Sequence, residues 1–78
     1  MSGAPAGGRH AALSTRACEL FGVELPIVQT GMGWVSGAQL TAATSSAGGL
    51  GILASATMTL DELRAAIAKV KSRTDKPF

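Results

Sequence analysis

Apolar residues along this 78-residue chain follow two kinds of pattern, short continuous runs and stripes with helical spacing. One apolar run extends from Pro26 to Thr30, and a second extends from Leu50 to Ala54. Runs of this length with few charges are typical of strands in a parallel sheet, which are covered on both faces. Between and after them, apolar residues recur every three or four positions, which indicates helices. The pattern therefore predicts alternating strands and helices.

The first of these helices is predicted to begin near Ser36, because Ser36 and Gln39 have the spacing of a capping box. It should end at Gly48 and Gly49, since a glycine after a helix adopts the left-handed conformation without a Cβ clash. The many alanines would let it pack closely on a sheet. Its predicted apolar face consists of three residues with one threonine beside them: Leu40, Ala43, Ala47 and Thr44.

The second helix repeats the same signals. Thr59 and Glu62 form another capping box, and the helix should end near Arg73. Residues 74–77 then predict a turn, and Phe78 is expected to begin a third strand. The predicted apolar stripe of this helix has five members: Leu60, Leu63, Ala66, Ile67 and Val70.

The segment that precedes these units, residues 1–14, is rich in alanine and glycine. It buries too little side chain to offset the entropy of ordering it, so we predict a flexible leader. The only histidine, His10, lies in this leader, and solvent exposure is a better expectation for it than catalysis. A short helical turn is predicted from Thr15 to Phe21, ended by Gly22.

These elements place the chain in the α/β class, with parallel strands joined by helical crossovers. A closed (β/α)8 barrel needs about 250 residues, and domains of about 100–150 residues are the commonest size. A chain of 78 residues supplies at most two βα units of such a fold. We therefore expect the rest of the domain to lie outside this sequence, and the two exposed sheet edges to favour self-association.

Composition excludes several classes of function. The formal net charge of +2 is too small to indicate nucleic-acid binding, and no run approaches the roughly 20 apolar residues of a membrane span. No metal-ligand cluster is expected. The lone Cys18 cannot form an internal disulfide, so a cytoplasmic protein is predicted. Four basic residues near the end of the last helix complement its dipole: Lys69, Lys71, Arg73 and Lys76.

The candidate ligand site is the glycine turn Gly31, Met32 and Gly33, which follows the first strand. Two narrow residues there would let a flat ring or a phosphate approach backbone N–H groups. A dinucleotide fingerprint is disfavoured, because Ser36 stands at its third glycine position and no acid closes the second strand. From spacing alone, an equally good interpretation is a tight turn with Met32 and Trp34 as core fillers.

Three motifs make the chain resemble a known family. The strand motif PIVQTGM, the helix stop AGGLG and the turn TDKPF occur in the order and spacing of the nitronate monooxygenases, formerly called 2-nitropropane dioxygenases. The resemblance extends from Leu20 to Phe78. It implies an FMN-dependent TIM barrel, of which residues 15–78 would be the N-terminal (βα)2 quarter.

The same resemblance implies where the cofactor lies. The family's first turn lies against the flavin ring, which makes Gly31, Met32 and Gly33 the expected FMN contacts. The family's catalytic histidine, its phosphate-binding loops and an asparagine of the next strand would all lie beyond Phe78. His10 matches none of these positions.

Three functions follow from the resemblance. The first is oxidation of a small alkyl nitronate with O2 by a flavin oxidoreductase. The alternative is an enoyl-CoA or thioester reductase that takes hydride from NAD(P)H, and a third is an inactive truncated fragment. The stretches GWVSGAQL and ASATMTLDEL are more similar to actinobacterial members linked to acyl-CoA or steroid-ring breakdown. Neither nucleic acid nor a membrane is an expected partner.

Overall fold

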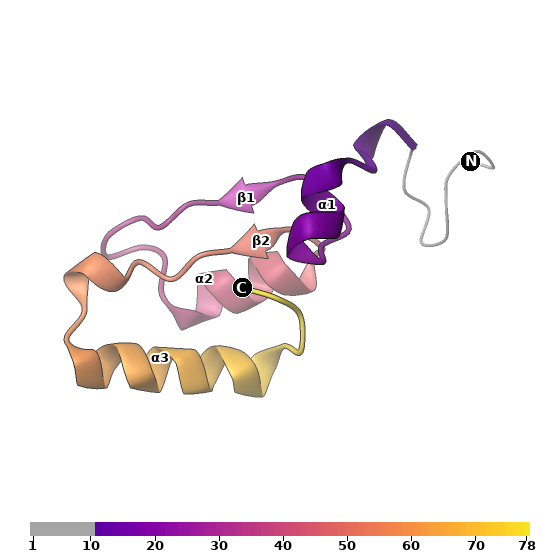
Figure 1. Ribbon diagram of the computed structural model, residues 1–78. Helices are drawn as coiled ribbons and strands as arrows, with labels where there is room; N and C mark the ends of the chain where they lie inside the picture. Colours follow the sequence, from indigo (N-terminus) through magenta and orange to yellow (C-terminus); the bar gives the residue numbers. More distant parts are fainter. Residues whose placement is uncertain (1–10) are drawn as a thin grey trace.

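The computed structural model describes residues 11–78 (Figure 1). The predicted leader therefore lies mostly outside the described residues, His10 included, and its last part contains a 3-10 turn. The elements follow one another as η1 (Ala11–Leu13), α1 (Arg16–Phe21), β1 (Val28–Gln29), α2 (Ala38–Ser46), β2 (Leu50–Gly51), η2 (Ser55–Thr57) and α3 (Leu60–Arg73).

The two strands form a parallel sheet, as predicted. Val28 pairs with Leu50, and Gln29 pairs with Gly51. Each strand has two residues, which is shorter than the predicted runs of five. No strand contains Phe78, so the predicted third strand is not formed within residues 11–78.

The strands are short because side chains, rather than backbone groups of the neighbouring strand, bond to the carbonyls that follow each strand. Beyond Gln29, the carbonyl of Thr30 accepts from the Ser36 hydroxyl at 3.1 Å. The carbonyl of Ile52 accepts from the side-chain amide of Gln29 at 3.1 Å. At the other end, Pro26 has no N–H to donate to a ladder.

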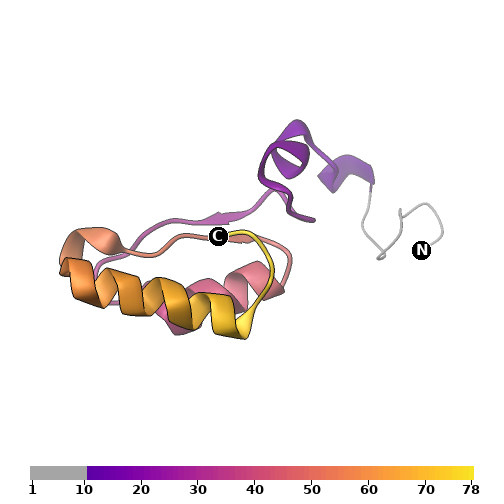
Figure 2. The same ribbon diagram turned by 60° about the horizontal axis from the view of Figure 1, so that its bottom comes forward.

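Helices cover one side of the sheet. Both views show α2 against the strands and α3 beyond it (Figures 1 and 2), and α2 contacts both β2 and α3. The approach of α2 to β2 is close, because a Cβ at Gly51 would overlap the Thr41 carbonyl. The buried Ser45 hydroxyl accepts from the Gly51 N–H at 3.0 Å. Small residues at this contact let the helix lie directly on the strand.

Two predictions about α2 are wrong. Its N-cap is Gly37 with no side-chain cap bond, because the Ser36 hydroxyl is turned toward the strand instead. Its buried face also differs from the predicted one: Ala43 and Ala47 are exposed, and the fully buried residues are Thr41, Ala42 and Ser45. The contact with Gly51 selects this face. The predicted end is confirmed, since Gly48 follows the helix with a φ of 108°.

The predicted start and end of α3 are confirmed. The Thr59 hydroxyl accepts from the Glu62 N–H at 3.1 Å, and the Glu62 carboxylate accepts from the Thr59 N–H at 2.8 Å. Along the predicted stripe, Val70 is completely buried, whereas Leu60 remains 74% exposed. Leu60 lies in the first turn of α3, so the predicted stripe is buried only toward the other end of the helix.

The short helix α1 also agrees with its prediction. It ends at Gly22, whose φ is 69°, and it buries the thiol of Cys18. That thiol lies 3.4 Å from the Leu13 carbonyl and ties α1 to η1. No helix within residues 11–78 has the length and apolar character needed to cross a membrane.

Candidate functional site

The turn after β1 lies where an α/β protein places its ligands. Figure 1 shows residues 30–37, η2 and the first turn of α3 at one end of the molecule, beyond the carboxyl ends of both strands. In parallel α/β folds, this end of the sheet carries the binding and catalytic loops. The turn predicted from the sequence is therefore at the ligand-binding end.

The Ser36 side chain is hydrogen-bonded to the backbone of the turn. Its side chain is 1% exposed, and its hydroxyl accepts from the Met32 N–H at 2.8 Å while donating to the Thr30 carbonyl at 3.1 Å. Its own N–H donates to the Met32 carbonyl at 2.8 Å, and its carbonyl accepts from the Ala54 N–H at 3.0 Å. The sequence suggested only a helix cap at this position, because a capping box and a buried serine have the same local signature.

Gln29 adds a second anchor. Its side-chain Nε2 lies 2.6 Å from the Thr30 carbonyl, 2.9 Å from the Ser36 hydroxyl and 3.1 Å from the Ile52 carbonyl. Its Oε1 is buried and has no hydrogen-bond partner among residues 11–78. Sequence reasoning overlooked Gln29, although a lone polar residue in an apolar strand signals a need for buried partners.

Gly33 allows a close approach rather than an unusual backbone angle. A Cβ at Gly33 would lie 3.0 Å from Thr57 Cγ2, whereas one at Gly31 would lie 3.4 Å from Ala54 Cα, close to an ordinary contact. The positive φ of the turn, 68°, belongs to Trp34. Gly33 thus lets the turn lie against the connection between β2 and α3.

The surface of the turn offers backbone donors beside apolar side chains. Hydrogen bonds within the turn use the N–H groups of Met32, Val35 and Ser36. The N–H groups of Gly31, Gly33 and Trp34 have no partner among residues 11–78. Met32 is 41% exposed and Trp34 is 89% exposed, so neither is a core filler within the described part of the chain.

A shallow pocket of about 180 Å³ adjoins the turn. It separates residues 34–37 from η2 and the start of α3, and it is lined by Trp34, Val35, Ser36, Gly37, Ala54, Thr57, Met58 and Glu62. Nowhere in residues 11–78 do three or more His, Cys, Asp or Glu side chains gather as metal ligands. The pocket therefore offers backbone groups and apolar side chains together with the Thr57 hydroxyl and the Glu62 carboxylate.

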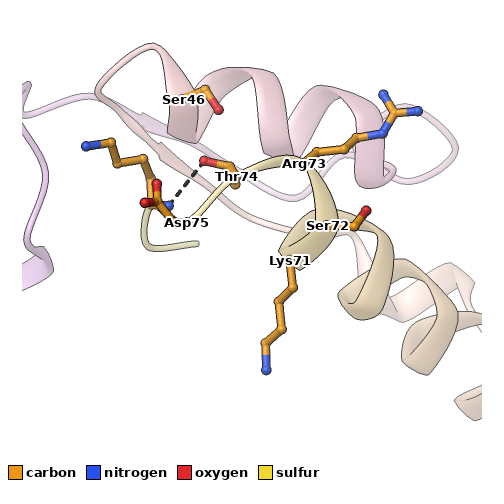
Figure 3. Close-up of a pocket in the computed structure, with 7 residues that line it drawn as sticks. Ser46, Lys71, Ser72, Arg73, Thr74 and Asp75 are labelled. Carbon is orange, nitrogen blue, oxygen red and sulfur yellow. Dashed lines mark hydrogen bonds between the residues drawn. The ribbon is translucent and has the colours of Figure 1, made fainter.

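The basic pocket at the opposite end of the molecule is a weaker candidate. Its volume is about 390 Å³, and it is lined by Ser46, Lys71, Ser72, Arg73, Thr74, Asp75 and Lys76. Figure 3 shows the Lys71 and Arg73 side chains pointing in different directions, with Asp75 between α2 and the chain end. Because Lys71 and Arg73 belong to the last turn of α3, they complement the helix dipole, as predicted.

Comparisons with known proteins agree on one family. A sequence model described as nitronate monooxygenase matches residues 14–78. The (3aS,4S,5R,7aS)-5-hydroxy-7a-methyl-1-oxo-octahydro-1H-indene-4-carboxyl-CoA dehydrogenase of Mycobacterium tuberculosis is 73% identical over 66 residues, which are 85% of this chain and 19% of that protein. A nitronate monooxygenase of Pseudomonas aeruginosa is 42% identical over the same shares.

A solved structure shows the same fold. FabK from Thermotoga maritima superposes with a TM-score of 0.81 at 48% identity, over 83% of this chain and 21% of that chain. FabK is a TIM-barrel enzyme, so the predicted fold class, a (βα)2 part of such a barrel, is confirmed. The chain spans about a fifth of the length of the relatives that it matches.

Proposed function

The chain belongs to the nitronate monooxygenase family, and from this we propose that the protein containing it is an FMN-dependent oxidoreductase. The family and FabK are FMN-dependent flavoenzymes. Residues 15–78 would form the N-terminal quarter of the barrel domain. The proposed cofactor contacts are Gly31, Met32 and Gly33, with catalytic groups supplied by later parts of the barrel.

The geometry of the turn supports a flavin. Free N–H groups at Gly33 and Trp34 can donate to the oxygen and nitrogen atoms on the edge of a flat ring. The half-exposed Met32 provides an adaptable apolar contact for the ring face. FMN, when bound, supplies the hydride and electron chemistry, while the protein positions the ring and controls its surroundings. The role of this chain is therefore to hold one edge of the cofactor.

We further propose that the substrate is an acyl-CoA thioester with a fused-ring acyl group. The observation that carries this proposal is the 73% identity to the indene-carboxyl-CoA dehydrogenase of M. tuberculosis, together with 65% identity to its counterpart in Rhodococcus jostii. Nitronate monooxygenases of two other bacteria are 42% and 44% identical over similar segments. Nitronate oxidation is therefore the second candidate. If the enzyme instead reduces an enoyl thioester, NAD(P)H is the proposed electron donor.

The test uses the full-length protein encoded by the gene to which this chain belongs. Released cofactor is identified by mass, and kcat/KM is then compared for a fused-ring acyl-CoA thioester with an artificial electron acceptor and for an alkyl nitronate with O2. We expect FMN and a higher kcat/KM for the thioester. Absence of flavin would contradict the cofactor proposal, and O2 uptake with the nitronate alone would establish the second candidate.

A further inference from the structure

We infer that Ser36 and Gln29 are positioning residues that hold the 31–33 turn in its flavin-binding form. This inference deepens the proposed function and depends on it. Neither residue offers its main polar atoms to a ligand, because the Ser36 hydroxyl and the Gln29 Nε2 are both bonded within the chain. They act on the turn through the Met32 N–H and the Thr30 carbonyl.

The Ser36 hydroxyl decides which backbone donors remain available. It binds the Met32 N–H at 2.8 Å, whereas the N–H groups of Gly31, Gly33 and Trp34 have no partner among residues 11–78 and stay free for a ligand. Without this hydroxyl, the Met32 N–H would lose its partner beneath the turn. A turn with an unbonded amide can shift so that this amide reaches another acceptor. The free N–H groups of the turn would then be displaced from the positions that the flavin requires.

Gln29 fixes the position of Ser36 relative to both strands. Its Nε2 reaches the Ser36 hydroxyl at 2.9 Å and the Ile52 carbonyl, 23 residues away in sequence, at 3.1 Å. The Oε1 atom has no hydrogen-bond partner among the described residues, which is an unfavourable arrangement for a buried acceptor. The unpaired Oε1 makes glutamine unfavourable at this position unless its Nε2 contacts are needed to hold the turn.

Ser45 provides a matched control for Ser36. Both serines are 1% exposed, and each accepts one hydrogen bond from a backbone N–H, Met32 for Ser36 and Gly51 for Ser45. Ser45 lies near the C-terminal end of α2, and Figure 1 shows that end of the helix away from the loop that follows β1. Ser45→Ala therefore removes one buried hydrogen bond to a backbone N–H away from the proposed ligand, whereas Ser36→Ala removes such a bond at the turn together with the contacts to the Thr30 carbonyl and to Gln29 Nε2.

The experiment measures two quantities in the full-length protein for wild type, Ser36→Ala and Ser45→Ala. The first is the Kd for FMN after cofactor removal, with the absorbance spectrum of the rebound flavin. The second is amide hydrogen exchange of the peptide covering residues 30–36 in the FMN-free protein. For Ser36→Ala we expect about a tenfold rise in Kd, a changed flavin spectrum and faster exchange. Ser45→Ala should change none of the three.

The outcomes separate this inference from the proposed function. Unchanged exchange in Ser36→Ala would overturn the role of the serine in holding the turn. Faster exchange with an unchanged Kd and spectrum would show a purely structural role and overturn the positioning role. Wild-type protein that binds no FMN would contradict the proposed function itself, whatever the exchange shows.

Gln29→Met gives an independent second variant. It keeps the length of the side chain and removes both the Nε2 donor and the unpaired Oε1. We expect it to fold and to raise exchange at residues 30–36 and the Kd for FMN in the same direction as Ser36→Ala. Wild-type values for both measurements would exclude Gln29 from the positioning role.

Discussion

The backbone at Gly51 lies against the Thr41 carbonyl so closely that a Cβ at position 51 would overlap it. Backbone occupies both sides of this contact, so neither side can rotate away. Gly51→Ala should therefore force α2 away from β2 and lower the free energy of unfolding of the full-length protein by about 1–3 kcal/mol. Denaturant titration measures the change.

Gly37→Ala is the control for Gly51→Ala. Gly37 precedes the same helix, α2, but a Cβ there meets nothing within 4 Å, and its φ of −84° suits alanine. We expect only a small change in its unfolding free energy, because the poorer N-cap that alanine makes for α2 is partly offset by the lower entropy of the unfolded chain. Equal stabilities for the two alanine variants would contradict the close packing of α2 on β2.

A second prediction concerns Gly33. Gly33→Val should reduce the FMN content of the purified protein, because a branched side chain would stand in the turn proposed to contact the ring. The ratio of flavin absorbance to protein concentration measures this. A folded variant with the flavin content of wild type would contradict the proposed placement of the cofactor.

Packing could produce the same loss, because a Cβ at Gly33 would lie 3.0 Å from Thr57 Cγ2. Thr57→Ser removes that methyl group and keeps the hydroxyl that donates to the Ala54 carbonyl. In the Gly33→Val/Thr57→Ser double variant, we expect flavin content to stay low. Recovery of flavin would assign the loss to the contact with Thr57 instead.

The third prediction tests the cap of α3. Thr59→Ala removes the oxygen that accepts from the Glu62 N–H and should lower stability by about 1 kcal/mol. Ser72→Ala, on the exposed face of the same helix, loses only a bond to the Lys69 carbonyl and should leave the denaturant midpoint nearly unchanged. Coincident midpoints for all three proteins would mean that the cap contributes nothing.

A fourth prediction concerns residues 1–78 prepared as an isolated peptide. Apolar side chains border an open groove of about 620 Å³ whose lining includes Leu20, Phe21, Ile52, Leu63 and Phe78. Uncovered surface of this kind promotes association. Sedimentation should therefore show oligomers or aggregates, and heating should give no sharp transition. A monomer that melts cooperatively and retains FMN would contradict this expectation.

Local signals were sufficient for the parts of the fold that depend on neighbours in sequence. The capping box of Thr59 and Glu62, the end of α2 before Gly48 and the end of α1 at Gly22 are all confirmed. The three motifs of the resemblance identified the family, which the family comparison confirms. The cofactor contacts at Gly31, Met32 and Gly33 remain a prediction.

The sequence by itself thus determined the order of strands and helices, the N-terminal cap of α3, the ends of α1 and α2, and the family, because these depend on spacings of a few residues. Only the tertiary structure decided what Ser36 and Gln29 do and which face of α2 is buried. The Ser36 carbonyl bonds to Ala54, and the Gln29 side chain bonds to Ile52. Ile52 and Ala54 both lie in the segment that connects β2 to α3. The Ser36 hydroxyl binds the Met32 N–H and the Thr30 carbonyl rather than capping α2. The bonds to Ala54 and Ile52 have no local signature, because their partners lie far apart in sequence.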